Sequence, residues 1–371
     1  MKKPVVSVAM VTCNVDRFLA ESIESILGQT FTEFEFIIVD FGSSDQSKSI
    51  ISSYAAKDSR IRFQEISNCS LPEARNAGCF LAQGKYIAIM DADDVSLPNR
   101  LLREVEFMEK HPEVGVVGGA VEWINATGKR LRKMQHPLTD SEIQSALLRY
   151  PALWQPSVLI RRDAFVSAGG YRPFFVVAHD YDLWLRIAER FQIANLEEVV
   201  LKYRIHPYQV SLGKRRQQSI CGVAAQASAI ARRNGNPDPL NGVKEITPAL
   251  LAGLGVTDAK QQATLASDCA WWVRSVYAAG ENDLALKTAV EMLQHDWLWG
   301  ERRRIADVQL IVARIFWRQN RFLSSFLAAG RAVLTRAILV GHPLNSTLRR
   351  LTNRGMRILE GFKFRPWGGR P

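Results

Sequence analysis

The sequence predicts an α/β protein with a mostly parallel sheet, followed by a region built from helices alone. In the first 120 residues, apolar runs of strand length alternate with segments whose apolar residues recur at helical spacing. Carboxylates follow two of these runs, at Asp40 and Asp91. Beyond residue 245 the chain shows helical periodicity only. Since strands that alternate with helices form parallel sheets, the sheet is expected in the first part of the chain.

The apolar runs place the first five strands over residues 5–11, 34–39, 61–66, 86–90 and 114–118. Apolar residues at helical spacing place helices over residues 18–27, 71–82 and 98–110. The third of these helices has Pro98 in its first turn, where proline is favoured. Asp40–Asp45 is a polar turn, and Ser44 or Asp45 can cap the helix after it. Because α/β sheets bind ligands at the carboxyl ends of their strands, Asp40 and Asp91 are placed for a nucleotide site.

The pattern between residues 140 and 245 is mixed. A strand is expected over 154–160, a helix over 180–191, a strand over 199–205, and a helix with a breaker-rich linker over 213–245. Helices then follow over 263–279, 283–295, 303–318 and 322–340. We therefore expect a first domain over 1–212, a helix and linker over 213–245, and a basic helical domain over 246–371.

The composition describes an ordinary globular protein, with 47% hydrophobic and 23% charged residues among 371. This length allows two domains. The five cysteines are odd in number and never spaced C-x-x-C, which argues against a disulfide framework and a zinc site. The N-terminal apolar stretch is too short for a secretion signal, and no apolar run approaches the ~20 residues that span a bilayer. We therefore expect a cytoplasmic protein.

Basic charge is concentrated near the C-terminus. Residues 301–371 hold 15 Arg and Lys against three acids, a local charge of +12, so the total of +11 leaves −1 for the remaining chain. This charge fits attachment to an anionic membrane surface through Arg-rich helices over 328–340 and 344–364, a solvated face of a helical bundle, or nucleic-acid binding. No helix-turn-helix, zinc-finger or RNP-like pattern accompanies the charge, so nucleic acid is the least favoured partner.

The most informative motif is Asp91-Ala-Asp93-Asp94, which directly follows the apolar run 86–90. Three carboxylates this close repel each other unless a cation lies between them. Oxygen ligands of this kind suit Mg²⁺ or Mn²⁺, which also bind the phosphates of substrates. The alternative is a solvated acidic turn in which Asp94 caps the helix that begins at Pro98.

Six motifs occur in one order along residues 5–212. They are Val6–Asn14, Glu24–Thr30, Phe36–Asp45, Ala74–Gly78, the Asp91 cluster with Pro98, and Asp180–Arg186. Together they closely resemble inverting glycosyltransferases of the GT-A fold, of the glycosyltransferase family 2 type. The resemblance implies a Rossmann-like, mostly parallel sheet with helices on both faces.

The resemblance implies a nucleoside diphosphate sugar as donor, with a UDP-sugar favoured, and Mg²⁺ or Mn²⁺ as cofactor. By the family pattern, Asp93 holds the metal, His206 contributes to the metal or the diphosphate, and Asp91 lies near the ribose. The cation would neutralise the charge that develops on the leaving diphosphate. The other implied nucleotide-binding residues are Thr12, Asn14, Asp40, Phe41 and Arg75. Purely structural roles for His206 and Arg75 are the alternatives.

The resemblance assigns the catalytic base to Asp180, which would take a proton from the acceptor hydroxyl. Asp182 would lie about 200° away around a helix, so both cannot serve one site. The alternative role of Asp180 is a helix N-cap. Many relatives have an acid before the base, whereas this chain has His179, so the pH optimum can differ. Gln155–Ser157 occupies the segment that usually borders the acceptor cleft.

Two positions depart from the family pattern. The family often has an aromatic residue at the position of Cys13, where it packs on the nucleobase. It often has a second acid at the position of Phe41, which helps to recognise the base. We hypothesise that Phe41 supplies the stacking surface that Cys13 lacks. The alternative is that Phe41 packs into its own loop.

The sequence thus predicts a metal-dependent, inverting glycosyltransferase that acts on a growing bacterial polysaccharide or a lipid-linked glycan. Family members often use lipid-linked acceptors at the cytoplasmic face of the inner membrane, which favours membrane attachment through residues 301–371. A sugar nucleotidyltransferase is the enzymatic alternative, but it would carry a Gly-rich basic loop after the first strand, and Thr12–Arg17 is not one. The other alternative is a non-catalytic glycan- or membrane-binding protein. The sequence favours catalysis over this alternative, because Asp91, Asp93 and Asp180 are all retained.

Overall fold

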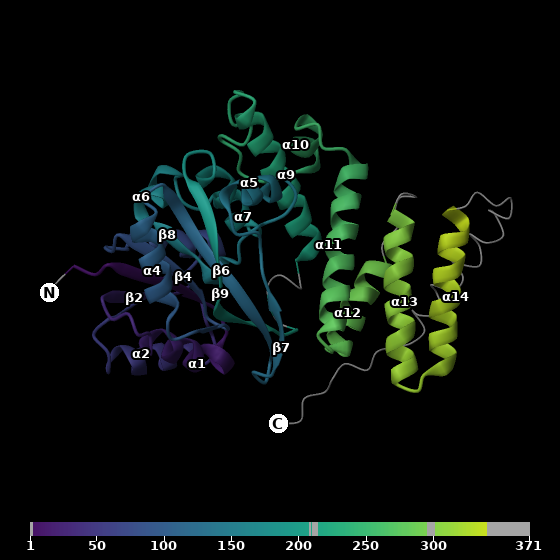
Figure 1. Ribbon diagram of the computed structural model, residues 1–371, viewed down its shortest axis with the longest axis horizontal. Coiled ribbons are helices and arrows are strands. Elements are labelled where there is room, and N and C mark those ends of the chain that lie inside the picture. The colour runs from purple at the N-terminus through teal and green to yellow at the C-terminus, as the bar shows by residue number, and fades with distance from the viewer. Residues whose placement is uncertain (1–2, 208, 210–213, 295–300, 340–371) are drawn as a thin grey trace. The chain divides into compact units, whose positions relative to one another are not determined.

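The computed structural model describes residues 3–207, 209, 214–294 and 301–339. The chain forms two compact units, Met1–Thr257 and Asp258–Pro371. Figure 1 shows the strands in the first unit and the helices α11 to α14 in the second. The finer predicted boundaries at residues 212 and 245 stay a prediction.

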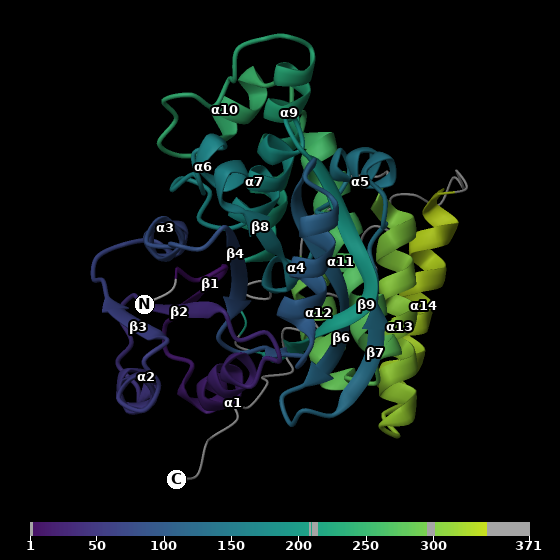
Figure 2. The same cartoon turned by 60° about the vertical axis from the view of Figure 1, so that its left-hand side comes forward.

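The first unit opens with strands and helices in alternation, as the apolar runs predict. The strands are β1 (Val6–Thr12), β2 (Phe34–Asp40), β3 (Ile61–Glu65) and β4 (Tyr86–Asp91). The helices between them are α1 (Asp16–Leu27), α2 (Ser47–Ala55) and α3 (Leu71–Phe80). In Figure 2, α3 lies on one side of β1, β2 and β3, and α1 and α2 lie on the other. With helices on both faces, β1 and β2 are buried along their whole length.

The register of these strands brings the predicted acids together. β1 pairs in parallel with β2 and with β4, and β2 pairs in parallel with β3. Thr12 lies opposite Asp40, and Val11 lies opposite Asp91. Because parallel strands end at the same edge of a sheet, Asp40 and Asp91 both lie at the carboxyl edge of this one.

The rest of the first unit completes a mixed sheet. Its strands are β5 (Val95–Ser96), β6 (Val114–Asn125), β7 (Arg130–Met134), β8 (Leu159–Arg161) and β9 (Gln192–Ile205). Its helices are α4 (Arg100–Lys110), α5 (Asp140–Leu147), the 3₁₀ turn η1 (Gln155–Ser157), α6 (Arg162–Ser167), α7 (His179–Ile187), α9 (Arg215–Arg233) and α10 (Pro248–Gly253). The strand order among the described residues is β3-β2-β1-β4-β8-β6-β9-β5, with β7 beside β6.

The direction of β8 differs from that of its neighbours. β8 runs antiparallel to β4 and to β6, while β6 and β9 are parallel. The amino end of β8 therefore lies at the edge where β4 ends, and this places η1 beside the Asp91 cluster. The strand predicted over 154–160 was wrong in its first half, because Gln155–Ser157 form a 3₁₀ turn that contains Pro156. Proline cannot donate to a sheet ladder.

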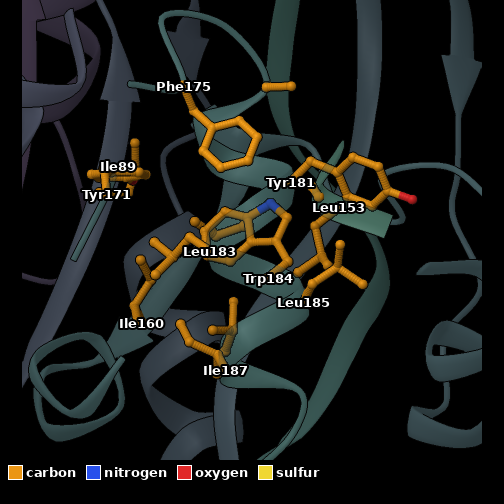
Figure 3. Packing of buried hydrophobic residues seen from close by; sticks show 14 of the residues in the cluster. Ile89, Leu153, Ile160, Tyr171, Phe175, Tyr181, Leu183, Trp184, Leu185 and Ile187 are labelled. Atoms are coloured by element: carbon orange, nitrogen blue, oxygen red, sulfur yellow. The ribbon is translucent and has the colours of Figure 1, made fainter. Parts of the chain in front are cut away.

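Helix α7 lies in the hydrophobic core of the first unit. Leu183, Trp184 and Ile187 are almost completely buried, and Figure 3 shows the indole of Trp184 among Phe175, Leu183 and Ile187. Every residue of α7 except Asp180 is buried, so the helix is held by packing on every side. The first turn of α7, which carries Asp180, is therefore fixed relative to the sheet.

A buried ion pair joins α4 to the middle of the sheet. Arg100 Nε donates to Glu104 Oε1 at 3.0 Å, and Arg100 Nη2 donates to the backbone oxygens of Ile89 at 2.9 Å and Val158 at 3.2 Å. Both charged side chains are fully buried. Burial raises the pKa of Glu104 to about 7, and the charge of Arg100 opposes this rise. One guanidinium thus connects α4, β4 and the residue that precedes β8.

The second unit consists of helices in its described part, as predicted. They are α11 (Asp258–Ala278), α12 (Asn282–Leu293), α13 (Arg302–Arg318) and α14 (Phe322–Leu339). Gly280 lies between α11 and α12 with φ 87°, a backbone conformation that favours glycine. The predicted helix over 344–364 lies outside the described residues. Among the helices that are described, none has the length and hydropathy needed to cross a bilayer.

Candidate active site

The ends of β1 and β2 form one side of the site. Asp40 is completely buried, and its carboxylate accepts hydrogen bonds from Thr12 Oγ1 at 3.0 Å, Gly42 N at 3.1 Å and Ser43 N at 2.9 Å. Asp40 therefore fixes the shape of the loop after β2. Thr12 and Asp40, both predicted to bind the nucleotide, lie in contact at this edge.

The loop after β1 is connected to the loop after β2. Asn14 has a left-handed backbone (φ 52°), and its Oδ1 accepts from Ser44 N at 2.8 Å. Beside it, Cys13 is exposed as a residue. Partial desolvation of its thiol, together with the charges of Asp40 and Asp45, raises the pKa of Cys13. Phe41 is half-buried and packs against the core. Stacking of Phe41 on a base stays a hypothesis.

The acidic motif places its three carboxylates in three different environments. Asp91 Oδ1 accepts from Arg75 Nη2 at 2.7 Å. Asp93 Oδ2 lies 2.9 Å from His206 Nε2. Asp94 is buried, and its Oδ1 accepts from the backbone N of Arg204 at 2.7 Å. Burial first, and then the charges of Asp93 and Asp91, raise the pKa of Asp94 well above its ordinary value.

The proposed capping role of Asp94 was wrong. Helix α4 begins at Arg100, two residues later than predicted, and Asn99 is its N-cap residue. The short strand β5 separates Asp94 from this helix, so the carboxylate contacts β9 instead. The acidic motif is therefore not a solvated turn, because Asp94 connects it to the last strand of the sheet.

Arg204 is a residue of the site that sequence reasoning missed. Its Nε donates to the backbone oxygen of Asp93 at 2.8 Å, and its Nη2 donates to Glu21 Oε2 at 2.6 Å. Arg204 is the second-last residue of β9, and His206 directly follows the strand; both contact Asp93. This i, i+2 spacing is the signal that could have linked Arg204 to the acidic motif.

Asp180 lies in the first turn of α7, after Ala178 with its left-handed backbone (φ 55°). Gln155 bridges Asp180 to Arg75. In the orientation that satisfies both neighbours, the Gln155 amide accepts from Arg75 Nη1 at 3.0 Å and Nε at 3.1 Å, and donates to Asp180 Oδ2 at 3.3 Å. Asp91, Arg75, Gln155 and Asp180 thus form one continuous chain of contacts.

Burial raises the pKa of Asp180 above its ordinary value, and the charge of Asp91 adds to the rise, while backbone N–H groups and Arg75 oppose it. Burial, together with the charge of Arg75, lowers the pKa of His179 well below its usual range. His179 is therefore neutral and adds no positive charge beside Asp180. Asp182 faces away, since its Oδ2 accepts from Arg186 Nη2 at 2.6 Å in a buried ion pair.

Within the described residues, no three His, Cys, Asp or Glu side chains form a cluster that could hold a metal ion. Asp93 and His206, both predicted as metal ligands, lie in contact with each other. They supply one carboxylate and one imidazole, a donor set that Mn²⁺ and Mg²⁺ accept when other oxygens complete the shell.

Comparisons with known proteins agree with this architecture. Residues 7–167 match the family model described as Glycosyl transferase family 2. An uncharacterized glycosyltransferase of Methanocaldococcus jannaschii is 36% identical over 210 residues, which cover 55% of this chain and 72% of that protein. The O-antigen biosynthesis glycosyltransferase WbnJ of Escherichia coli is 31% identical over 205 residues, which cover 54% of this chain and 80% of that protein.

Two solved structures share the fold. S. aureus TarS in complex with UDP-GlcNAc aligns with a TM-score of 0.51 at 14% identity, over 88% of this chain and 90% of that chain. The mannosyltransferase PcManGT from Pyrobaculum calidifontis, in complex with GDP-Man and Mn²⁺, aligns with a TM-score of 0.50 at 16% identity, over 89% and 88%. They confirm the predicted fold class, a GT-A domain followed by helices. Since relatives above 30% identity are matched over more than two thirds of their length, this chain belongs to glycosyl transferase family 2 and is a glycosyltransferase.

Proposed function

We propose that this glycosyltransferase transfers a sugar from a nucleoside diphosphate donor to a hydroxyl group of a growing polysaccharide or lipid-linked glycan, with inversion at the anomeric carbon. The contact chain from Asp91 through Arg75 and Gln155 to Asp180 carries the proposal, because it joins the strand-end acids to a half-buried carboxylate in the first turn of α7. The names of related proteins support the substrates: WbnJ is an O-antigen biosynthesis enzyme, and the two solved structures hold UDP-GlcNAc and GDP-Man.

Asp93 and His206 would hold Mg²⁺ or Mn²⁺ together with the donor diphosphate. Such ions usually take only one or two protein ligands in nucleotide sites, and phosphates and water supply the others. Two adjacent donors from the protein therefore fit this role. When bound, the cation offsets the negative charge that builds on the leaving diphosphate.

Asp180 would act as the general base. Its carboxylate accepts the proton of the acceptor hydroxyl while that oxygen forms a bond to the anomeric carbon. The bond from the anomeric carbon to the diphosphate breaks in the same step, and its electron pair leaves with the diphosphate. Direct displacement of this kind inverts the anomeric centre and needs one base. A pKa raised by burial makes Asp180 a better proton acceptor than an exposed aspartate.

Substitution Asp93→Ala tests the metal site. We expect the wild-type protein, given a panel of nucleotide sugars, Mn²⁺ and acceptor glycans, to release a nucleoside diphosphate, and we expect the variant to lose at least about 10²-fold of this activity. Chromatography of the released nucleotide measures the reaction. Asp163→Ala is the matched control, because it removes an exposed carboxylate on α6. If the wild-type protein neither releases a nucleoside diphosphate nor binds one in calorimetry, the proposed function is wrong.

Substitution Gln155→Leu tests the bridge. Because a hydrogen bond to the ionised form of an acid lowers its pKa, loss of the amide should raise the pKa of Asp180. The acidic limb of the kcat/KM profile should then move by about one unit to higher pH, since the base must be ionised to act. Gln144→Leu is the control, because Gln144 donates to Ala188 O on another part of the unit. An unchanged acidic limb would show that Gln155 does not act on Asp180.

A further inference from the structure

Helix α14 places its small side chains inward and its large apolar side chains outward. Ser325 Oγ donates to Ala313 O at 2.8 Å and Thr335 Oγ1 donates to Gln309 Oε1 at 3.1 Å, so these two residues face α13. Ala328 and Ala332 are buried on the same side. On the outer side, Leu323, Phe326 and Val333 are 76%, 66% and 64% exposed. A helix of a soluble bundle normally shows the opposite arrangement.

The outward residues form one continuous surface. At 100° per residue, Phe322, Phe326 and Val333 fall within about 40° of one another, and Leu323 and Leu327 widen the stripe to about 140°. The ring of Trp317, at the end of α13, lies 4.9 Å from the ring of Phe322 and 6.1 Å from that of Phe326. We call these six residues the apolar face. They make up half of the large hydrophobic side chains that are exposed in the described part of the chain.

The charge around the apolar face is positive. Residues 301–339 contain eight arginines and two acids, and no acid occurs from 308 to 339. Arg318 and Arg321, between which the chain passes from α13 to α14, are both exposed. A second copy of the chain would place this positive surface against itself, because a two-fold interface brings the same patch of both copies together. The charge therefore favours an anionic partner.

We propose that the apolar face binds the surface of a bilayer that contains anionic lipids. Aromatic and leucine side chains partition into the headgroup and upper acyl region, and arginines bind lipid phosphates around them. No acid between residues 308 and 339 opposes an anionic surface. The exposed Asp283 of α12, which accepts from Gln319 Nε2 at 3.4 Å, is outnumbered by Arg318 and Arg321 in the same turn region. This surface lies on residues 317–333, inside the segment 301–371 for which the sequence predicts membrane attachment. It overlaps the expected helix over 328–340 and does not include the one over 344–364. The proposal does not depend on the donor or the acceptor of the transfer reaction.

Co-sedimentation of the full chain with sucrose-loaded vesicles tests the proposal. We expect binding to phosphatidylcholine vesicles that contain phosphatidylglycerol, weaker binding at high salt, and little binding to phosphatidylcholine alone. Leu323→Glu with Phe326→Glu should lower the partition coefficient at least about tenfold. Val166→Glu with Ile230→Glu is the matched control, because it changes the charge equally at two exposed apolar positions of the first unit and should leave binding unchanged.

A charge-neutral variant and an oligomer measurement complete the test. Leu323→Ser with Phe326→Ser should lower vesicle binding as well, and circular dichroism should show unchanged helix content, because the substituted side chains point outward. Wild-type protein that fails to bind the anionic vesicles would overturn the proposal, and so would variants that bind as well as the wild type. Light scattering that shows a dimer lost in the variants, with no vesicle binding, would assign the face to a second copy instead.

Discussion

Substitution Asp180→Asn is expected to lower kcat by about 10³-fold, the usual contribution of a general base, and to leave donor binding nearly unchanged. The amide cannot accept the proton of the acceptor hydroxyl, but it preserves the size of the side chain at the start of α7. The part of the site that is proposed to bind the nucleotide, built on β1, β2 and β4, stays intact. Single-turnover kinetics and calorimetric titration with the nucleoside diphosphate measure the two effects separately.

Asp182→Asn is the informative comparison for this variant. Asp182 is buried and paired with Arg186, and Arg172 Nη1 lies 3.6 Å from its Oδ1. Its replacement should lower stability, because Arg186 loses its buried counter-charge, while Arg172 still pairs with Asp238. The pH profile of the surviving protein should stay the same. A rate loss below tenfold in Asp180→Asn would mean that another group takes the proton.

Substitution Arg100→Met is expected to lower the free energy of unfolding by about 3–5 kcal/mol, as removal of one partner from a buried ion pair usually does. Glu104 would lose the charge that offsets its burial, and the backbone oxygens of Ile89 and Val158 would lose a donor. Denaturation with urea at neutral pH measures the change. The effect should be smaller at pH 5, where Glu104 can take up a proton in the folded protein, since burial raises its pKa to about 7.

The double variant Arg100→Met with Glu104→Met provides the control for this argument. Removal of both charges leaves apolar side chains of similar length, and such replacements are often neutral or stabilising. We expect the double variant to recover most of the stability lost in the single one. If the double variant is as unstable as the single one, the lost free energy of unfolding comes from the missing hydrogen bonds to Ile89 and Val158. The unpaired carboxylate would then not be its cause.

Local pattern was sufficient for much of the fold. The strands β1, β2 and β4 end within one residue of their predicted positions. Asp40 and Asp91, the last residues of β2 and β4, lie at the same edge of the sheet. The pattern could not show the reversed direction of β8, which depends on its pairing with β4 and β6. For the same reason it left Gln155 without a specific role, since that residue reaches the site only because β8 enters the sheet from this edge.

The environments of individual acids were beyond local pattern. Asp91, Asp93 and Asp94 are nearly adjacent in the chain, yet their partners Arg75, His206 and Arg204 come from two distant elements. A sequence read one segment at a time treats the three carboxylates alike. The distinction arises from tertiary contacts, which bury Asp94; this burial raises the pKa of Asp94 well above its ordinary value.

The contacts of β9 also bear on the order in which activity appears during synthesis. Asp93 meets His206 across 113 residues, and Asp94 meets Arg204 across 110. Contacts of such long range form late, since loop closure must precede them. A nascent chain that has released its first four strands from the ribosome still lacks both partners. We therefore expect binding of the proposed nucleotide-sugar donor to begin only when β9 is in place, so that unfinished chains cannot consume this donor.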